Sequence, residues 1–397
     1  MSRLSMNHLN TPVRRRLGQD RIFSIDTVRG FAMVLVICQH SYLSVNQKLI
    51  APSLNTLIWV ITGFAAVAFV SISGAVYSYF LFLHSDWKAV YRRYVARAAL
   101  MILVAHPVIS ILSYYFRMEF EPSLWLPLTI SERILLNFPI TDIIAICLLI
   151  SPMLILRIRP VMRALLIMIM LTIAPVIVAL AHPTSPVASY IIEAIFGVPG
   201  EPRFFWYPLI PWLAIFLSGS FLGREVALAK SGLLDSGTLV RRLKMAGKYL
   251  AVCCIALLTG YKLLKINFVY EWDPSFFLAI YPRQATMLLP GYFAVFTWYF
   301  VTNLERIDMK GNINRFDWLL SIFGRTSLFT FIVQFAVVES APAFLGYTGL
   351  FGMTGFLMLF ILGLTIMLAL SYFYGRMRSI LPHQDYKVIK HALIAGK

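Results

Sequence analysis

Charged residues are scarce in this sequence: Asp, Glu, Lys and Arg make up 13% of its 397 residues, whereas 59% are hydrophobic. Disordered chains and water-soluble globules carry far more charge, so the composition excludes both classes. With 22 glycines, the sequence is also too poor in glycine for a collagen. A mean hydropathy of +0.76 requires most of the chain to lie in lipid, as repeated apolar helices of about 20 residues. The sequence therefore predicts an all-α protein, a polytopic bundle of transmembrane helices.

Cysteine is also rare, and all four cysteines lie inside apolar runs: Cys38, Cys147, Cys253 and Cys254. Two adjacent residues on one helix point in different directions, so Cys253 and Cys254 cannot easily pair. We expect neither a structural disulfide nor a metal site.

Acidic residues number 18 against 35 basic ones, which gives a formal net charge of +17. Such an excess can indicate nucleic-acid binding when it is concentrated in one domain. Here the basic residues lie at the ends of apolar runs and are spread over at least four connections. We therefore expect a basic inner membrane surface and no nucleic-acid partner.

Apolar stretches with suitable flanks predict about ten transmembrane helices, and an even number places both termini on one side of the membrane. The ten stretches are residues 27–46, 57–83, 93–115, 135–156, 162–181, 207–223, 247–265, 276–301, 317–338 and 348–373.

Basic residues are distributed unequally between the two sets of connections. The even-numbered connections carry Lys88, Arg92, Arg93, Arg157, Arg159, Arg163, Arg224, Lys230, Arg241, Arg242, Lys244, Lys248, Arg306, Lys310 and Arg315. The odd-numbered ones carry Lys48, Arg117, Arg133, Arg203, Lys262 and Lys265. Because Lys and Arg favour the cytoplasmic side, we expect both termini to be cytoplasmic. The chain then divides into a basic tail (1–20), a transmembrane domain (21–375) and a C-terminal tail (376–397).

Polar residues within the first predicted span suggest a functional site, because such groups are costly in lipid. Asp26 and Arg29 lie at its cytoplasmic entrance, and Gln39 and His40 follow, the latter eleven residues after Arg29. Eleven residues make about three helical turns, or about 16 Å, so Arg29 and His40 lie on one face. Histidine is the side chain best suited to remove a proton from a hydroxyl or amine near neutral pH. A buried structural imidazole and a local Arg29–Asp26 pair are the alternatives.

Other polar residues give weaker signals. Asp142 begins the fourth span near the outer face, where a helix N-terminus favours a carboxylate. Arg283 and Gln284 lie about two turns into the eighth span and are candidates for a substrate site. Trp206 belongs either to an interfacial aromatic belt or to a platform on which a substrate stacks. His106 precedes Pro107, and we interpret it as a partner of a helix kink.

Several motifs resemble the transmembrane acyltransferases, above all the heparan-alpha-glucosaminide N-acetyltransferase-like family and, more distantly, the acyltransferase 3 family. The most specific are Asp26-Thr-Val-Arg29-Gly30-Phe-Ala with His40 at the matching interval, and Tyr207-Pro-Leu-Ile-Pro211-Trp212 running on to Gly223-Arg224. Further matching stretches are Phe69-Val-Ser-Ile-Ser73-Gly74, Asp142-Ile-Ile-Ala-Ile, Asp273-Pro274-Ser-Phe-Phe and Gly324-Arg325-Thr-Ser327-Leu328. The resemblance extends over about residues 21–340.

This resemblance implies transfer of an acyl group, most simply acetyl, from cytoplasmic acyl-CoA to a sugar hydroxyl or amine on the extracytoplasmic side. It implies that His40 is the catalytic base, with Gln39 and Asp142 as further catalytic candidates. It also implies that Arg29, Arg224 and Arg325 contact the phosphates of the donor. We expect the bacterial inner (plasma) membrane as the location, and no metal.

Two positions depart from the family pattern. Eukaryotic members carry Asn where His40 stands and supply a histidine from the following outer loop, whereas residues 41–58 contain none here. This difference favours His40 as the base. Gln334 stands where many relatives have histidine, and it can hydrogen-bond a substrate but cannot act as a base.

A membrane transporter or flippase is the competing interpretation, with the buried polar residues forming a substrate path. Against it, the predicted six plus four spans form no repeat, and we find no paired broken helices. The acceptor, the acyl group, the choice between direct transfer and an acyl-histidine, and a homo-oligomeric state remain open.

Overall fold

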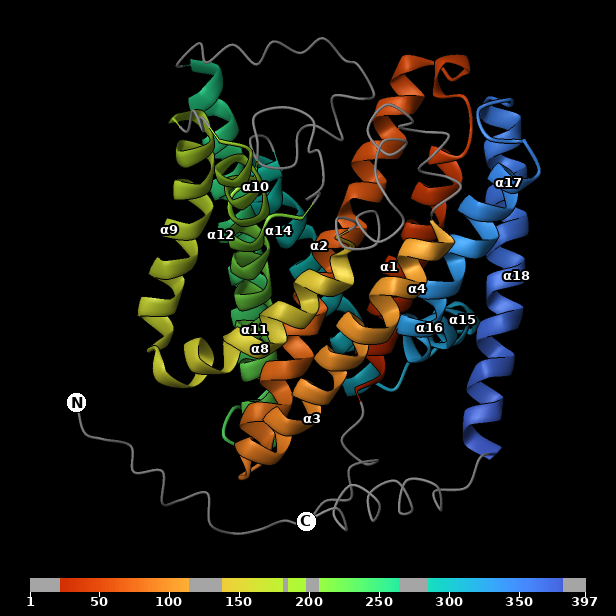
Figure 1. Ribbon diagram of the computed structural model, residues 1–397. Helices are drawn as coiled ribbons and strands as arrows, with labels where there is room; N and C mark the ends of the chain where they lie inside the picture. Colours follow the sequence, from red (N-terminus) through yellow and green to blue (C-terminus); the bar gives the residue numbers. More distant parts are fainter. Residues whose placement is uncertain (1–21, 114–137, 181–184, 198–206, 264–284, 381–397) are drawn as a thin grey trace, which may run out of the picture.

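A computed structural model describes residues 22–113, 138–180, 185–197, 207–263 and 285–380 (Figure 1). These residues form helices and no strand, which confirms the all-α class.

The N-terminal half begins with two long helices followed by a helix that changes pitch. Its helices are α1 (Phe23–Leu43), α2 (Pro52–Leu83), α3 (Trp87–Leu100), the π-helix η3 (Met101–Ala105), α4 (His106–Leu112), α8 (Ile140–Arg157) and α9 (Pro160–Leu180). The π-turns of η3 lie just before Pro107, where a proline removes a backbone donor from the helix. The predicted kink at His106 thus coincides with a real change in helical pitch.

The C-terminal half contains more short helices. Its elements are α10 (Pro186–Ile195), α11 (Leu209–Lys230), α12 (Ser236–Leu263), α14 (Ala285–Asn303), the π-helix η4 (Leu304–Met309), α15 (Arg315–Arg325), α16 (Ser327–Gln334), the π-helix η5 (Phe335–Ser340), α17 (Ala341–Phe344) and α18 (Met353–Ile380).

Six helices within the described ranges are long and apolar enough to cross a membrane. They are Pro52–Leu83, Trp87–Leu112, Ile140–Arg157, Leu209–Lys230, Ser327–Phe344 and Met353–Arg378. The chain is therefore a helical membrane protein, while the count of ten spans stays a prediction.

The expected ninth span, 317–338, is not one helix and is corrected by the structure. The amphipathic helix α15 ends at Arg325, and Thr326 leaves helical geometry with φ −110° and ψ 18°. The apolar helix that follows starts at Ser327 and continues to Phe344. Continuous apolar character across the break concealed it.

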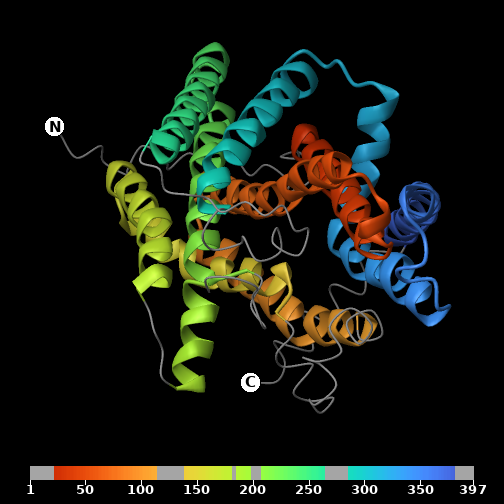
Figure 2. The same cartoon turned by 90° about the horizontal axis from the view of Figure 1, so that it is seen from above.

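Two helices lie at opposite edges of the bundle with apolar side chains facing outward. Figures 1 and 2 place α9 on one side and α18 on the other. Exposed apolar residues on them include Val161, Met162, Leu165, Met168, Leu357, Met358, Ile361 and Leu362. Lipid is the solvent that accommodates such surfaces.

The centre of the bundle is formed by α1, α2 and α11, which pack closely. A Cβ atom on Gly219 would lie 2.0 Å from the carbonyl oxygen of Ser71, and one on Gly223 would lie 1.8 Å from that of Ala75. A Cβ atom on Gly74 would likewise lie 2.0 Å from the carbonyl oxygen of Phe216. Small residues spaced four apart thus let the two backbones touch, as in other membrane helix pairs.

Candidate active site

A second close crossing, between α1 and α15, positions two arginines. A Cβ on Gly30 would lie 1.8 Å from the carbonyl oxygen of Leu320, and one on Gly324 would lie 1.9 Å from that of Asp26. Only glycine fits at these points. Arg29 and Arg325, the neighbours of these glycines, line one cavity, so the crossing brings together two of the predicted donor-binding residues.

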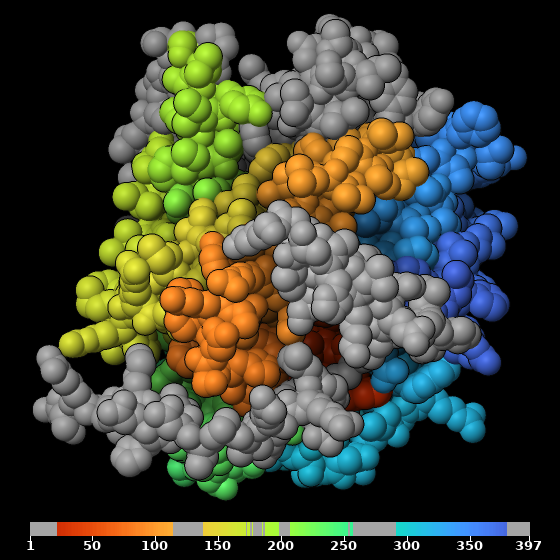
Figure 3. Space-filling model, turned by 60° about the horizontal axis from the view of Figure 1, so that its bottom comes forward, coloured from red at the N-terminus to blue at the C-terminus, as the bar shows by residue number. Residues whose placement is uncertain are grey.

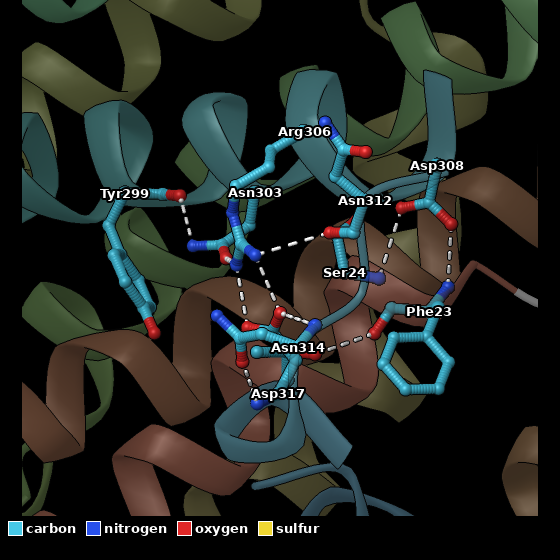
Figure 4. A network of polar contacts seen from close by, with 10 residues as sticks. Phe23, Ser24, Tyr299, Asn303, Arg306, Asp308, Asn312, Asn314 and Asp317 are labelled. Carbon is cyan, nitrogen blue, oxygen red and sulfur yellow. Dashed lines mark hydrogen bonds and ion pairs between the residues drawn. The ribbon is translucent and has the colours of Figure 1, made fainter. Parts of the chain in front are cut away.

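The start of α1 is held by the segment that leads into α15 (Figure 4). Ile22, the N-cap of α1, provides no side-chain cap. Instead, the Asp308 carboxylate accepts hydrogen bonds from the backbone N–H groups of Phe23 and Ser24, at 2.8 and 3.0 Å. A carboxylate at a helix N-terminus satisfies free donors and interacts favourably with the helix dipole.

The same segment is braced by an arginine–aspartate pair, also drawn in Figure 4. Arg306 donates two hydrogen bonds of 2.6 Å to the two carboxylate oxygens of Asp317, and a third, of 2.9 Å, to Asn303. Asp317 also completes a capping box with Asn314 at the start of α15. The hydrogen bonds from Arg306 lower the pKa of Asp317, which keeps it a carboxylate. Together these contacts fix α15 against α1.

The cavity measures about 600 Å³, a size typical of ligand sites. Its lining includes four arginines, Arg29, Arg97, Arg325 and Arg378, and the part that they line is called here the arginine end. With the bottom of the molecule turned forward, α1 is recessed between the orange helices and the blue C-terminal helices (Figure 3). Four cations around one cavity form a site for a multiply charged anion.

The cavity becomes apolar and aromatic away from the arginine end. Along the α3–η3 helix, its lining extends from Tyr94 to Ala105, about 16 Å at the usual helical rise. The far end, called here the histidine end, is lined by Phe69, Ala105, Thr141 and Phe331. The cavity therefore suits an elongated molecule with an anionic part and an apolar part.

His40 is paired with a carboxylate and is not itself a lining residue; it approaches the cavity lining through Phe335. Its Nδ1 contacts Oε1 of Glu339 on η5, and the two side chains are 17% and 3% exposed. The ring of Phe335 meets the imidazole edge-on at 5.0 Å and contacts Phe331 of the cavity lining. A carboxylate at Nδ1 sets the tautomer so that Nε2 can accept a proton.

Asp142 belongs to a second pair of the same kind. Its Oδ2 lies 2.5 Å from Nδ1 of His106, the first residue of α4. Ala105 and Thr141, which are next to these two residues in sequence, line the cavity. His106 is thus both a residue of the kink and the partner of a predicted catalytic carboxylate.

The other predicted site residues are placed elsewhere or fall outside the described ranges. Gln39 is half-buried on α1 and is not part of the cavity lining. Gln334 is fully buried, on a helix face with Thr330, which bonds Ser371 of α18. Arg224 forms an ion pair with Glu225 at 2.8 Å, away from the cavity lining. Outside the described residues lie Trp206, Arg283 and Gln284.

No group of three or more His, Cys, Asp or Glu side chains that could hold a metal ion occurs in the described part of the chain. Cys38 and Cys147 are free thiols.

Sequence reasoning missed Arg97, Arg378, the role of Glu339 and the His106–Asp142 contact. Glu339 carried a usable signal, because it is an acidic residue inside an apolar run. Arg97 and Arg378 carried none, since arginines near span ends are expected at the inner surface anyway.

The model of one protein family, the catalytic domain of heparan-alpha-glucosaminide N-acetyltransferase, matches residues 21–255. The match covers more than half of the chain and includes Arg29, His40 and Asp142. The chain therefore belongs to this family, which confirms the resemblance found in its motifs. No curated protein matches the sequence.

Proposed function

Because the chain belongs to this acetyltransferase family, we propose that it is an integral-membrane acyltransferase that moves an acyl group, most simply acetyl, from cytoplasmic acyl-CoA to a sugar hydroxyl or amine on the extracytoplasmic side. The observation that carries the proposal is one cavity lined by four arginines, with a histidine–carboxylate pair that approaches its lining through Phe335.

The arginine end fits the charged part of the donor. Coenzyme A carries several phosphate charges, and guanidinium groups bind phosphates through paired, charge-assisted hydrogen bonds. The apolar stretch from Leu100 to Ala105 fits its pantetheine arm and directs the thioester toward Phe331. Arg29 and Arg325 hold the donor here, with Arg97 and Arg378 as additional contacts.

In the transfer step, His40 acts as the general base. Its Nε2 removes the proton from the acceptor hydroxyl or amine while that oxygen or nitrogen attacks the acyl carbonyl carbon. The carbon–sulfur bond then breaks, and the proton passes from His40 to the leaving thiolate. Glu339 orients the imidazole and stabilises its charged form while the proton resides there.

The direction of transfer follows from the expected orientation. In this orientation the arginine end, near the start of α1, faces the cytoplasm, and the excess of Lys and Arg in the even-numbered connections supports it. A reporter that fluoresces only in the cytoplasm, fused after Lys397, should then be bright. A dark but stably expressed fusion would contradict this orientation.

The test of function is transfer from labelled acetyl-CoA by the full-length protein in membrane vesicles. His40→Ala and His40→Asn should each lose about 10²- to 10⁴-fold in rate, the usual contribution of a general base. Donor binding should be nearly unchanged in both. His84→Ala is the matched control, because His84 caps α2 and lies outside the cavity lining.

Two outcomes would contradict the proposal. Near-native turnover by His40→Asn would show that His40 only positions substrate. A wild-type protein that binds acetyl-CoA without ever consuming it would instead support a transporter.

A further inference from the structure

A second histidine–carboxylate pair, which the transfer step does not use, follows two lining residues of the cavity, Ala105 and Thr141, in sequence. His106 and Asp142 are 14% and 5% exposed, and their contact is 2.5 Å long. The other carboxylate oxygen of Asp142 and the hydroxyl of Thr141 are buried without a hydrogen-bond partner among the described residues. Thr141 lines the cavity, so a polar ligand bound there can satisfy its hydroxyl.

The two pairs lie on elements that touch. Helix α4, which starts at His106, packs against η5, which carries Glu339. Ala105, next to His106 in sequence, and Phe331, which contacts the Phe335 ring beside His40, both line the cavity. The described elements packed against α4 and η3 carry the acidic groups Asp142 on α8 and Glu339 on η5, the latter paired with His40.

The two acceptor classes differ in the number of protons that the acceptor loses. A hydroxyl acceptor loses one proton, which ends on the thiol of coenzyme A, so one base suffices. An amine enters as R–NH3+ and leaves as an amide N–H, and it therefore loses two protons. One reaches the thiol and the other must be released, which requires a second group.

Resting on the proposed function, we propose that His106 and Asp142 form a second acid–base pair that takes the first proton from an amine acceptor. His106 accepts this proton, and Asp142 stabilises the resulting imidazolium. The free amine then attacks the acyl carbonyl, while His40 carries the second proton to the thiolate. The proton on His106 is released to water before the next cycle.

The test compares two acceptors with full-length protein in vesicles and labelled acetyl-CoA: glucosamine, which offers an amine, and N-acetylglucosamine, which offers hydroxyls only. His106→Gln and Asp142→Asn should lower transfer to glucosamine at pH 6.5 by about 10-fold, because only a small fraction of an amine is unprotonated at that pH and the variants depend on that fraction. Transfer to N-acetylglucosamine should fall much less. His84→Gln serves as the matched control.

The pH dependence of the transfer rate distinguishes an acid–base role of His106 from a structural one. At pH 9 most glucosamine is already the free amine, so the variants should regain most of the lost rate. Equal losses for both acceptors, or a loss that does not depend on pH, would assign His106 only to the kink at Pro107. Wild-type transfer to N-acetylglucosamine or water alone would also contradict this role, whereas no consumption of acetyl-CoA would overturn the proposed function itself.

Discussion

The crossings α1–α15 and α2–α11 use the same backbone device for different purposes. Each places glycines so close to carbonyl oxygens of the opposite helix that a Cβ atom would lie about 2 Å from them, and each has a Gly–Arg pair. Gly324 precedes Arg325 at the first crossing, and Gly223 precedes Arg224 at the second. Both guanidinium groups also approach a phenylalanine ring, at 5.6 and 5.9 Å.

The two arginines differ in what lies beside them. Arg325 lines the cavity and is 4.0 Å from Asp26, whereas Arg224 is paired with its neighbour Glu225 at 2.8 Å. A Gly–Arg pair at a helix crossing is therefore no sign of ligand binding by itself. Its function depends on whether a cavity opens at that crossing.

The largest expected effect comes from filling the first crossing. In Gly30→Ala the new methyl group meets the Leu320 carbonyl, so the helices must separate, at a cost of about 1–3 kcal/mol for overpacking. Arg29 moves with the backbone, so donor affinity should fall as well. Gly219→Ala should lose similar stability without a specific effect on donor affinity. Thermal unfolding in detergent and the donor KM measure the two quantities.

A matched control exists for this experiment. A Cβ on Gly247 of α12 would lie 3.7 Å from its nearest neighbour, an ordinary contact. Gly247→Ala should therefore be neutral or slightly stabilising. Equal effects of Gly30→Ala and Gly219→Ala on donor KM would remove the functional difference between the crossings.

Next in size is the loss of the Arg29 cation. Arg29→Ala should raise the donor KM by about 10- to 100-fold, the equivalent of one charged hydrogen bond. Because this contact forms in both the ground state and the transition state, kcat should change little. A fall in kcat alone would show that Arg29 acts in the chemical step or in folding.

A smaller effect separates the two Gly–Arg pairs directly. Arg325 is 43% exposed, so solvent weakens its contact, and Arg325→Ala should raise the donor KM by about 3- to 10-fold. Arg224→Ala should leave it unchanged, because its guanidinium is engaged with Glu225. The same steady-state assay on both variants provides the test. A larger rise in KM for Arg224→Ala than for Arg325→Ala would show that Arg224 contacts the donor.

Much of the fold could be predicted from hydropathy, since long apolar runs such as that of α2 have no stable alternative to a membrane helix. The break at Thr326 could not, because the apolar character continues from α15 into α16. It follows directly after the point where Gly324 packs on α1, a contact between residues almost 300 positions apart.

For the site, too, one part could be predicted from the sequence and another part could not. Arg29 and His40 share one helix, so their spacing was sufficient to relate them. Glu339 is 299 residues from His40, and Asp142 is 36 from His106. Such pairings depend on which helices become neighbours, and the pattern of a single helix does not contain that information.

The smallest expected effect concerns an exposed ion pair, which tests whether backbone contact rather than surface charge holds the crossings. Lys244 and Lys310 contact Glu305 at 2.7 and 2.9 Å and lower its pKa from 4.5 to about 2. A carboxyl with a lowered pKa stabilises the fold above its unfolded pKa and loses that contribution as the pH falls toward the folded value.

Glu305→Gln should therefore unfold at a slightly lower temperature than the wild type at pH 7. The difference should shrink between pH 5 and pH 3, and also in 1 M salt, because exposed pairs are screened. A shift at pH 7 as large as that of Gly30→Ala would show that surface charge contributes as much as the crossings themselves.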